Sequence, residues 1–172
     1  MPVRGQHVVA GALQDGSGGE AFTAMDPHGG GALAPSYHDA LPAQIDAACA
    51  AAGAAALPFA ATTPVQRAAL LRAIADGLLQ LGDELLQRYS AETALPAARA
   101  NAERGRTVGQ LLQFAALLDD GAWVEARIDR AEPQRQPQPK PDLRSMLVPL
   151  GPVAVFGASN FPLAYSVAGG DT

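Results

Sequence analysis

Three prolines divide the middle of the chain into helices, and this division limits the fold more than any other feature of the sequence. Pro42, Pro64 and Pro96 each stand where a helix can begin, because proline has no N–H to donate and its fixed φ suits a first helical turn. Apolar residues recur at helical spacing between them, and Gly121 is of the residue type that commonly ends a helix. The sequence therefore predicts a helical region over residues 42–121.

The apolar side chains of this region predict which helix faces are buried. The helix near Pro64 has the clearest start signal, because Thr63 can cap it and Gln66 completes a capping box. Gly82 separates this helix from the next piece. The side chains that we expect to face the core are Ile45, Ala48, Cys49, Ala52, Leu70, Leu71, Ile74, Leu78, Val108, Leu111, Leu112 and Ala115.

The charged and reactive side chains of the helical region are interpreted as structural. Glu103, Arg104 and Arg106 are predicted to lie on a solvated face or in ion pairs between helices. Cys49 has no basic residue near it in the sequence to lower its pKa, which favours a small core residue over a nucleophile. Because there is no second cysteine for a disulfide, we expect a reducing, cytoplasmic compartment.

The two ends of the chain have different patterns from its helical middle. Residues 1–35 contain short β-like pieces between glycine-rich turns, which predict a hairpin or two edge strands. Residues 131–142 contain four prolines and predict an extended connector of polyproline type, followed by strand-like alternation over 143–148. The apolar run 152–156 is bounded by glycines, which suits a buried parallel strand. The expected fold class is α/β.

The composition excludes several classes of function. Twelve basic against seventeen acidic side chains give a net charge of −5, which argues against nucleic-acid binding. With 48% hydrophobic and 17% charged residues the chain can build a core, so intrinsic disorder is excluded. The long uncharged runs 47–66 and 145–170 are interrupted by prolines, and we expect no membrane span. The three histidines have no paired spacing on one helix face, so we predict no metal site.

Two glycine-containing motifs allow more than one interpretation. Residues 16–21 satisfy the pattern G-x-G-x-x-A, but β-like residues and Pro27 follow where a helix should open, which indicates a turn. Residues 157–161 are close to the nucleophile elbow G-x-S-x-G around Ser159. Phe161 replaces the last glycine and no histidine follows the serine, so a hydrolase-like protein is the weaker hypothesis here.

The same region has a stronger resemblance to a known family. The run 149–163, Pro-Leu-Gly-Pro-Val-Ala-Val-Phe-Gly-Ala-Ser-Asn-Phe-Pro-Leu, resembles the aldehyde dehydrogenase pattern that begins P-x-G and ends N-F-P. Residues 26–27 resemble the N-P start of that family's first conserved region, and residues 92–96 resemble its E-T-G-K-P motif, with Ala-Leu in place of Gly-Lys. The strings 103–107 and 155–172 are most similar to one branch, the 2,5-dioxovalerate (α-ketoglutaric semialdehyde) dehydrogenases.

This resemblance covers nearly all 172 residues and implies an architecture. The chain would form part of an NAD(P)-binding domain, in which edge strands and a helical bundle lead into the first strand of a Rossmann-like cofactor domain. It implies a hairpin region over 1–35, helices over 42–121, a connector and strand over 131–150, and the first Rossmann strand with an oxyanion turn over 151–172.

The resemblance also implies roles for individual residues. Asn160 would donate its side-chain N–H to the oxyanion that forms when a cysteine thiolate attacks the aldehyde. Phe156, Gly157, Ala158 and Ser159 would lie beside the cofactor, NADP or NAD, at the end of the first Rossmann strand. The expected substrate is a small semialdehyde, and the full-length protein is expected to be a homo-oligomer.

The resemblance further implies that essential groups are missing from these residues. The family's catalytic cysteine and general-base glutamate would follow Thr172, and Cys49 on an N-terminal helix cannot replace that cysteine. We therefore expect a truncated N-terminal fragment that has no dehydrogenase activity alone. Two alternatives stay open: a degenerate α/β-hydrolase-like protein around Ser159, and a non-catalytic helical module whose proline-rich segment binds a partner.

Overall fold

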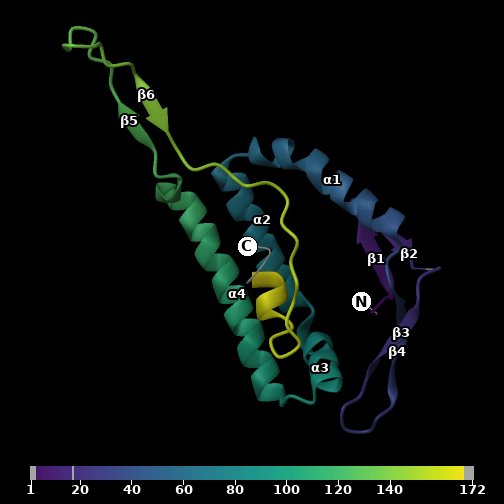
Figure 1. The fold of residues 1–172 in the computed structure, drawn as a ribbon. Coiled ribbons are helices and arrows are strands. Elements are labelled where there is room, and N and C mark those ends of the chain that lie inside the picture. Colours follow the sequence, from purple (N-terminus) through teal and green to yellow (C-terminus); the bar gives the residue numbers. More distant parts are fainter. Residues whose placement is uncertain (1–2, 17, 169–172) are drawn as a thin grey trace.

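The computed structural model describes residues 3–16 and 18–168, and it combines helices with short antiparallel β-ribbons (Figure 1). The strands are β1 (Gln6–Val9), β2 (Ala12–Asp15), β3 (Ala21–Met25), β4 (Ala32–His38), β5 (Arg127–Asp129) and β6 (Leu143–Ser145). The helices are α1 (Pro42–Ala60), α2 (Pro64–Gln80), α3 (Gly82–Thr93) and α4 (Ala97–Asp120), with a 3₁₀ turn, η1 (Ala122–Val124), and a π-helical turn, η2 (Ala164–Ala168). The mixed fold class is as predicted.

A hairpin was one of the two arrangements predicted for the N-terminal region, and the structure contains two hairpins there. Strands β1 and β2 pair antiparallel around Ala10 and Gly11, whose φ angles of 51° and 77° match the positive values that a tight type I′ turn requires. Strands β3 and β4 form a second hairpin with a register shift between Thr23 and Ala24. Strand β4 continues to His38, beyond the predicted limit at residue 35.

The core lies where α2 and α4 pack against each other. Small side chains dominate the contact, since Ala68 and Ala75 of α2 and Ala100 and Ala115 of α4 are at most 1% exposed. Short side chains let two helix backbones approach closely. Leu111 is buried as predicted, but Leu70, Ile74 and Leu112 were expected in the core and are 38–45% exposed.

The buried face predicted for α1 is wrong. No residue of this helix is buried in the structure, Ile45 is 52% exposed, and Cys49 is exposed rather than part of the core. Figure 1 shows α1 beside the N-terminal hairpins, away from α4. A helical period shows which face can be buried, but burial needs a partner, and none of the described residues covers this face.

By length and composition alone, α1 would be able to cross a membrane. It has 19 residues and a mean hydropathy of 1.3. The core helix of a water-soluble protein and a signal sequence pass the same test, but no part of this helix is buried in the structure. The absence of a membrane span stays a prediction.

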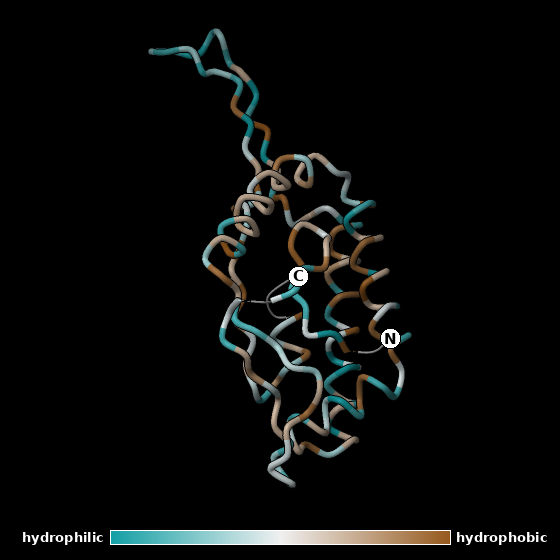
Figure 2. Tube along the Cα trace, turned by 90° about the vertical axis from the view of Figure 1, so that its right-hand side faces the viewer, coloured by the Kyte–Doolittle hydropathy of each residue, from teal (hydrophilic) through white to brown (hydrophobic). Residues whose placement is uncertain are grey.

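The extended connector predicted for residues 131–142 is also wrong. These residues form the tip of a ribbon whose two sides are β5 and β6, with a further bridge between Glu132 and Lys140. The Nζ atom of Lys140 lies 2.5 Å from Asp129 Oδ1 and 3.1 Å from Glu132 Oε1. Lys140, on the β6 side of the ribbon, therefore forms ion pairs with two carboxylates on the β5 side. Figure 2 shows the projecting ribbon with a hydrophilic tip. Prolines suit this tip because it needs few backbone N–H donors. The strand predicted over 143–148 is formed at Leu143–Ser145.

The buried parallel strand predicted over residues 152–156 is not formed. Residues 149–158 form no strand, and Leu150 and Phe156 are 100% and 92% exposed. A parallel strand is held by hydrogen bonds to neighbouring strands, and the described residues place none beside this segment. The chain instead passes along the helices and ends its described part in η2, which packs on α4 (Figure 1).

Candidate functional site

The turn at residues 158–161 borders an open cavity of about 520 Å³. The main-chain N–H of Phe161 donates to the carbonyl oxygen of Ala158 across 3.2 Å and closes the turn. Ser159, Asn160 and Phe161 form one wall. The remaining lining comes from the end of α3, the residues that follow it and the start of α4: Glu92, Thr93, Leu95 and Arg99. Two segments about 60 residues apart in sequence therefore share one small cavity.

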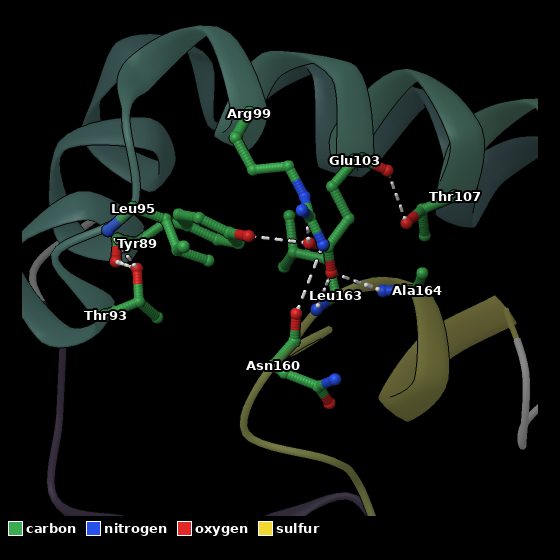
Figure 3. A network of polar contacts seen from close by, with 9 residues as sticks. All are labelled: Tyr89, Thr93, Leu95, Arg99, Glu103, Thr107, Asn160, Leu163 and Ala164. Carbon is green, nitrogen blue, oxygen red and sulfur yellow. Dashed lines mark hydrogen bonds and ion pairs between the residues drawn. The ribbon is translucent and has the colours of Figure 1, made fainter.

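A buried carboxylate on α4 fixes the segment that follows this turn (Figure 3). One oxygen of Glu103 accepts the main-chain N–H groups of Leu163 at 2.9 Å and Ala164 at 3.0 Å. Its other oxygen accepts the hydroxyl of Tyr89 at 2.6 Å. Glu103 is only 3% exposed. The prediction that Glu103 lies on a solvated face is therefore wrong, because these donors replace the water that a carboxylate would otherwise need.

The environment of Glu103 shifts two pKa values in opposite directions. Burial would raise the pKa of Glu103, but hydrogen bonds from Tyr89, Ala164 and Leu163 and the charge of Arg99 together hold it below its usual 4.5. Burial, the hydrogen bond to Glu103 and the charge of that carboxylate raise the pKa of Tyr89 to about 12. Glu103 is thus an anion at neutral pH, and Tyr89 is a neutral donor.

Two arginines of α4 surround the aromatic ring of Phe161. The guanidinium carbon of Arg99 lies 4.4 Å from the ring centroid, and that of Arg106 lies 5.5 Å from it. Arg106 also lies 5.7 Å from the ring of Tyr165, which itself contacts Phe161 at 4.9 Å. Arg99 donates to the main-chain oxygen of Asn160 at 3.4 Å. Arg104 points elsewhere and donates to the carbonyl oxygen of Gly82 at 3.0 Å.

Comparison with known protein families identifies the family to which the chain belongs. The sequence model of the family described as "Aldehyde dehydrogenase family" matches residues 14–169. The chain belongs to the aldehyde dehydrogenase family.

Named relatives in this family are much longer than the chain. It is 49% identical over 173 residues to "Alpha-ketoglutaric semialdehyde dehydrogenase 2" of Azospirillum brasilense. This match covers 100% of the chain and 33% of the relative. It is 50% identical over 129 residues to "Alpha-ketoglutaric semialdehyde dehydrogenase" of Acinetobacter baylyi, covering 75% of this chain and 24% of the relative. The chain thus spans a third or less of these aldehyde dehydrogenases.

Solved structures share the fold of this chain. An NAD-dependent benzaldehyde dehydrogenase from Corynebacterium glutamicum matches with a TM-score of 0.67 and 23% identity, over 74% of this chain and 27% of the other. PnpE in complex with nicotinamide adenine dinucleotide matches with a TM-score of 0.66 and 24% identity, over 76% and 26%. At this identity the likeness concerns the fold alone.

The structure brings together some of the site residues predicted from the aldehyde dehydrogenase resemblance. Ser159 and Asn160 line the cavity, whereas Phe156, Gly157 and Ala158 do not. In Figure 3 the side-chain amide of Asn160 points away from the Glu103 network. A Cβ atom on Gly157 would lie 2.2 Å from Ser166 Oγ, so a larger residue there would require the Ser166 side chain to move. Among the described residues, no group of three or more His, Cys, Asp or Glu side chains offers a metal site.

The segment predicted to hold the cofactor remains accessible in the structure. Phe156 is 92% exposed and Ser159 is also exposed. Ser166 fills the side-chain position of Gly157, but Ala158 carries only a methyl group, so a planar or phosphate-bearing group can approach the main chain near Ala158 and Ser159 from outside. These residues therefore fit NAD(P) as far as they extend, and their cofactor role stays a prediction.

Sequence reasoning missed the part that Glu103, Tyr89 and Arg99 have in this site. A signal for Glu103 was present, because it lies on the same helical stripe as Ala100, Thr107 and Leu111, all of which are buried. An acidic residue on a buried stripe predicts a partner. The sequence gives no comparable signal for Arg99, whose neighbours come from a segment about 60 positions away.

Proposed function

We propose that this chain is part of an enzyme that oxidises an aldehyde to a carboxylate, with 2,5-dioxovalerate as the substrate and 2-oxoglutarate as the product. The identity of 49% over the whole chain to a relative named for α-ketoglutaric semialdehyde carries this proposal. The two names denote the same compound. The reaction removes a hydride from the aldehyde carbon, for which bound NADP or NAD is the acceptor, and water supplies the second carboxylate oxygen.

Asn160 is the residue of this chain that we propose to act on the substrate. It lines the cavity, and its side-chain amide is directed away from the Glu103 network (Figure 3). An amide N–H is a neutral donor that does not titrate, so it can stabilise negative charge developing on the aldehyde oxygen at any working pH. Glu103 supports this role indirectly, because it holds the main chain three and four residues after Asn160.

The chain alone is proposed to be inactive. Its single cysteine, Cys49, lies exposed on α1 and does not line the cavity. We expect purified residues 1–172 to reduce neither NADP nor NAD in the presence of 2,5-dioxovalerate. Cofactor reduction above the enzyme-free rate would contradict this part of the proposal.

A chimera tests the activity itself. Residues 1–172 would replace the matching third of the Azospirillum brasilense relative, to which they align over their whole length. The expected result is 2,5-dioxovalerate-dependent formation of NADPH or NADH, followed at 340 nm, with 2-oxoglutarate as the product by mass spectrometry. A folded chimera of native oligomeric size that oxidises no aldehyde would overturn the proposal. Cytoplasmic location and homo-oligomer formation are parts of the same proposal, and the mass of the chimera in solution tests the second.

A further inference from the structure

The side chain of Asn160 is placed by the main chain around it rather than by contacts of its own. Asn160 is exposed, and its side-chain amide forms no hydrogen bond to any of the described residues. In Figure 3 this amide points away from the Glu103 network. A side chain takes up a few staggered positions relative to its own main chain. A group that fixes the main chain at Asn160 therefore limits where the amide can point.

The peptide unit that joins Asn160 to Phe161 is held at both of its polar ends. Its N–H, on Phe161, donates to the carbonyl oxygen of Ala158 at 3.2 Å. Its carbonyl oxygen, on Asn160, accepts an N–H of the Arg99 guanidinium at 3.4 Å. Because a peptide unit is planar, bonds at opposite edges keep the whole plane from rotating. The first bond comes from within the turn, and the second comes from α4.

Arg99 is itself held from two sides. Its guanidinium carbon lies 4.4 Å from the centroid of the Phe161 ring, which is a cation–π distance. Its Nε lies 4.0 Å from Oε2 of Glu103, one helical turn later on α4, whose side chain is only 1% exposed. A buried anion attracts a nearby cation more strongly than an anion in water does. Arg99 therefore connects the carboxylate of Glu103 to the turn that carries Asn160.

Arg99 and Glu103 hold the chain on the two sides of Pro162. Arg99 contacts residues 160–161 before the proline, and Glu103 accepts the main-chain N–H groups of residues 163–164 after it. The ring of Pro162 fixes its own φ and restricts the conformation of the residue before it. The segment is thus stiff at its centre and is fixed to α4 at each end.

We infer that Arg99 is a positioning residue, which keeps the amide of Asn160 directed at the aldehyde oxygen by fixing the main chain of Asn160. This inference rests on the proposed function and assigns Arg99 no contact with the substrate, because its charge is engaged by Glu103. Glu103 cannot replace Arg99 in this role, since its own bonds begin three residues beyond Asn160. Without Arg99 the amide would be present but poorly directed, and a misplaced donor stabilises the transition state less.

Kinetics of the chimera provide the first test. Arg99→Met keeps an apolar contact with Phe161 but removes the hydrogen bond to Asn160, and we expect kcat to fall roughly 10- to 100-fold while KM changes little. Arg99→Lys keeps a cation and a donor and should recover part of this loss. Arg127→Gln on β5 is the control that should match the parent, since the Arg127 side chain is 78% exposed. A rise in KM with unchanged kcat, or no change in either constant, would overturn the inference.

A double-mutant cycle separates the positioning of Asn160 from a general structural role. In the Asn160→Ala background there is no amide to misplace, so adding Arg99→Met should lower kcat by no more than about twofold. Arg106→Met is the matched control, because it removes the other guanidinium beside the Phe161 ring and leaves the bond to Asn160 intact. Its effect on kcat should be the same in both backgrounds. Equal fold-losses from Arg99→Met in both backgrounds would show that Arg99 supports the fold rather than the amide, and would overturn the inference.

Folding of each variant is checked by circular dichroism and by its native mass. If Arg99→Met does not fold, Arg99→Gln takes its place in both experiments, because it also removes the cation. The same expected results and the same contrary results apply to it.

Backbone dynamics of the 172-residue chain provide a test that needs no activity. Order parameters from ¹⁵N relaxation are compared between the parent and Arg99→Met. We expect the values at residues 160–161 to fall from about 0.85 toward about 0.6, while those at residues 163–164, which Glu103 holds, stay high. Unchanged values at residues 160–161, or an equal fall over the whole segment, would overturn the inference.

The experiments separate failure of the inference from failure of the proposed function. A chimera that oxidises 2,5-dioxovalerate with the same kcat with and without Arg99 keeps the function and rejects the positioning role. A chimera that oxidises no aldehyde rejects the function, and the order parameters then decide whether Arg99 holds the main chain of Asn160.

Discussion

The hydroxyl of Tyr89 and the carboxylate of Glu103 form a 2.6 Å hydrogen bond between α3 and α4, with both residues at most 5% exposed. This bond joins the end of the helical bundle to the segment that carries Asn160, because the other oxygen of Glu103 holds the N–H groups of Leu163 and Ala164. A single buried carboxylate therefore connects three parts of the chain. Its removal should affect the position of the turn as well as the stability of the fold.

Substitutions of this pair are expected to destabilise the chain to different degrees. Glu103→Ala leaves two main-chain N–H groups and the Tyr89 hydroxyl without an acceptor, which should lower the free energy of unfolding by about 3 kcal/mol. Tyr89→Phe removes one donor from a buried anion and should cost about 2 kcal/mol. Urea unfolding followed by circular dichroism measures both values. If Glu103→Ala unfolded at the same urea concentration as the parent, the network would not hold the turn in solution.

The lowered pKa of Glu103 predicts a pH dependence of stability. Because this pKa is below 4.5 in the folded chain, the unfolded chain binds more protons near that pH, and the stabilisation is lost as the pH falls through the folded pKa. The urea midpoint should therefore drop between pH 6 and pH 3. Glu103→Gln cannot titrate, so its midpoint should fall less over the same range. A parallel fall in both proteins would assign the dependence to other carboxylates.

Local signals explain why the helix boundaries could be predicted from the sequence. Thr63, Pro64 and Gln66 determine the start of α2 through contacts within four residues, so no knowledge of the tertiary structure was needed. Burial could not be predicted in the same way. Helix α1 is rich in alanine on all sides, so its sequence does not single out one face, and Ile45 stays exposed because the described part of the chain provides no surface to cover it.

The candidate site was predicted only where it follows one continuous motif. Ser159 and Asn160 were found because they lie in such a motif, and they do line the cavity. Arg99 was missed because the residue that it contacts, Asn160, lies about 60 positions later in the sequence and is brought to it only by the fold. The strand expected near Phe156 depends on neighbouring strands, which a run of apolar residues cannot supply by itself.

The capping box at the start of α2 is expected to contribute measurably to the stability of the chain. The hydroxyl of Thr63 accepts the N–H of Gln66 at 3.2 Å, and the Gln66 side chain accepts the N–H of Thr63 at 2.8 Å. Thr63→Ala should destabilise the chain by about 1 kcal/mol, and Thr63→Ser should be close to neutral because it keeps the acceptor. Thermal unfolding compares the three proteins. Equal losses in the Ala and Ser variants would show that the methyl group, rather than the cap, is responsible.

Two glycine-to-alanine substitutions should change the stability of the chain in opposite directions. Gly157→Ala would place a Cβ atom 2.2 Å from Ser166 Oγ, and the required shift should cost about 1–3 kcal/mol. The double variant Gly157→Ala with Ser166→Ala removes that oxygen and should recover most of the loss. Gly109→Ala adds a Cβ in open space within α4 and should stabilise the chain by about 0.5–1 kcal/mol. Destabilisation by Gly157→Ala that the double variant fails to relieve would contradict the predicted clash.

Substitution of Asn160 is expected to lower kcat more than any other change in the chimera with the Azospirillum brasilense relative. Asn160→Ala removes the proposed donor to the aldehyde oxygen, and loss of one such donor lowers kcat by about 100- to 1,000-fold in other enzymes. KM should change much less, because the donor acts on charge that is greatest in the transition state. Asn160→Asp has nearly the same shape but no side-chain N–H, so it should be equally impaired, whereas Thr63→Ser, outside the cavity lining, should keep kcat. If Asn160→Ala oxidised 2,5-dioxovalerate as fast as the parent chimera, Asn160 would only shape the turn that Phe161 closes with Ala158.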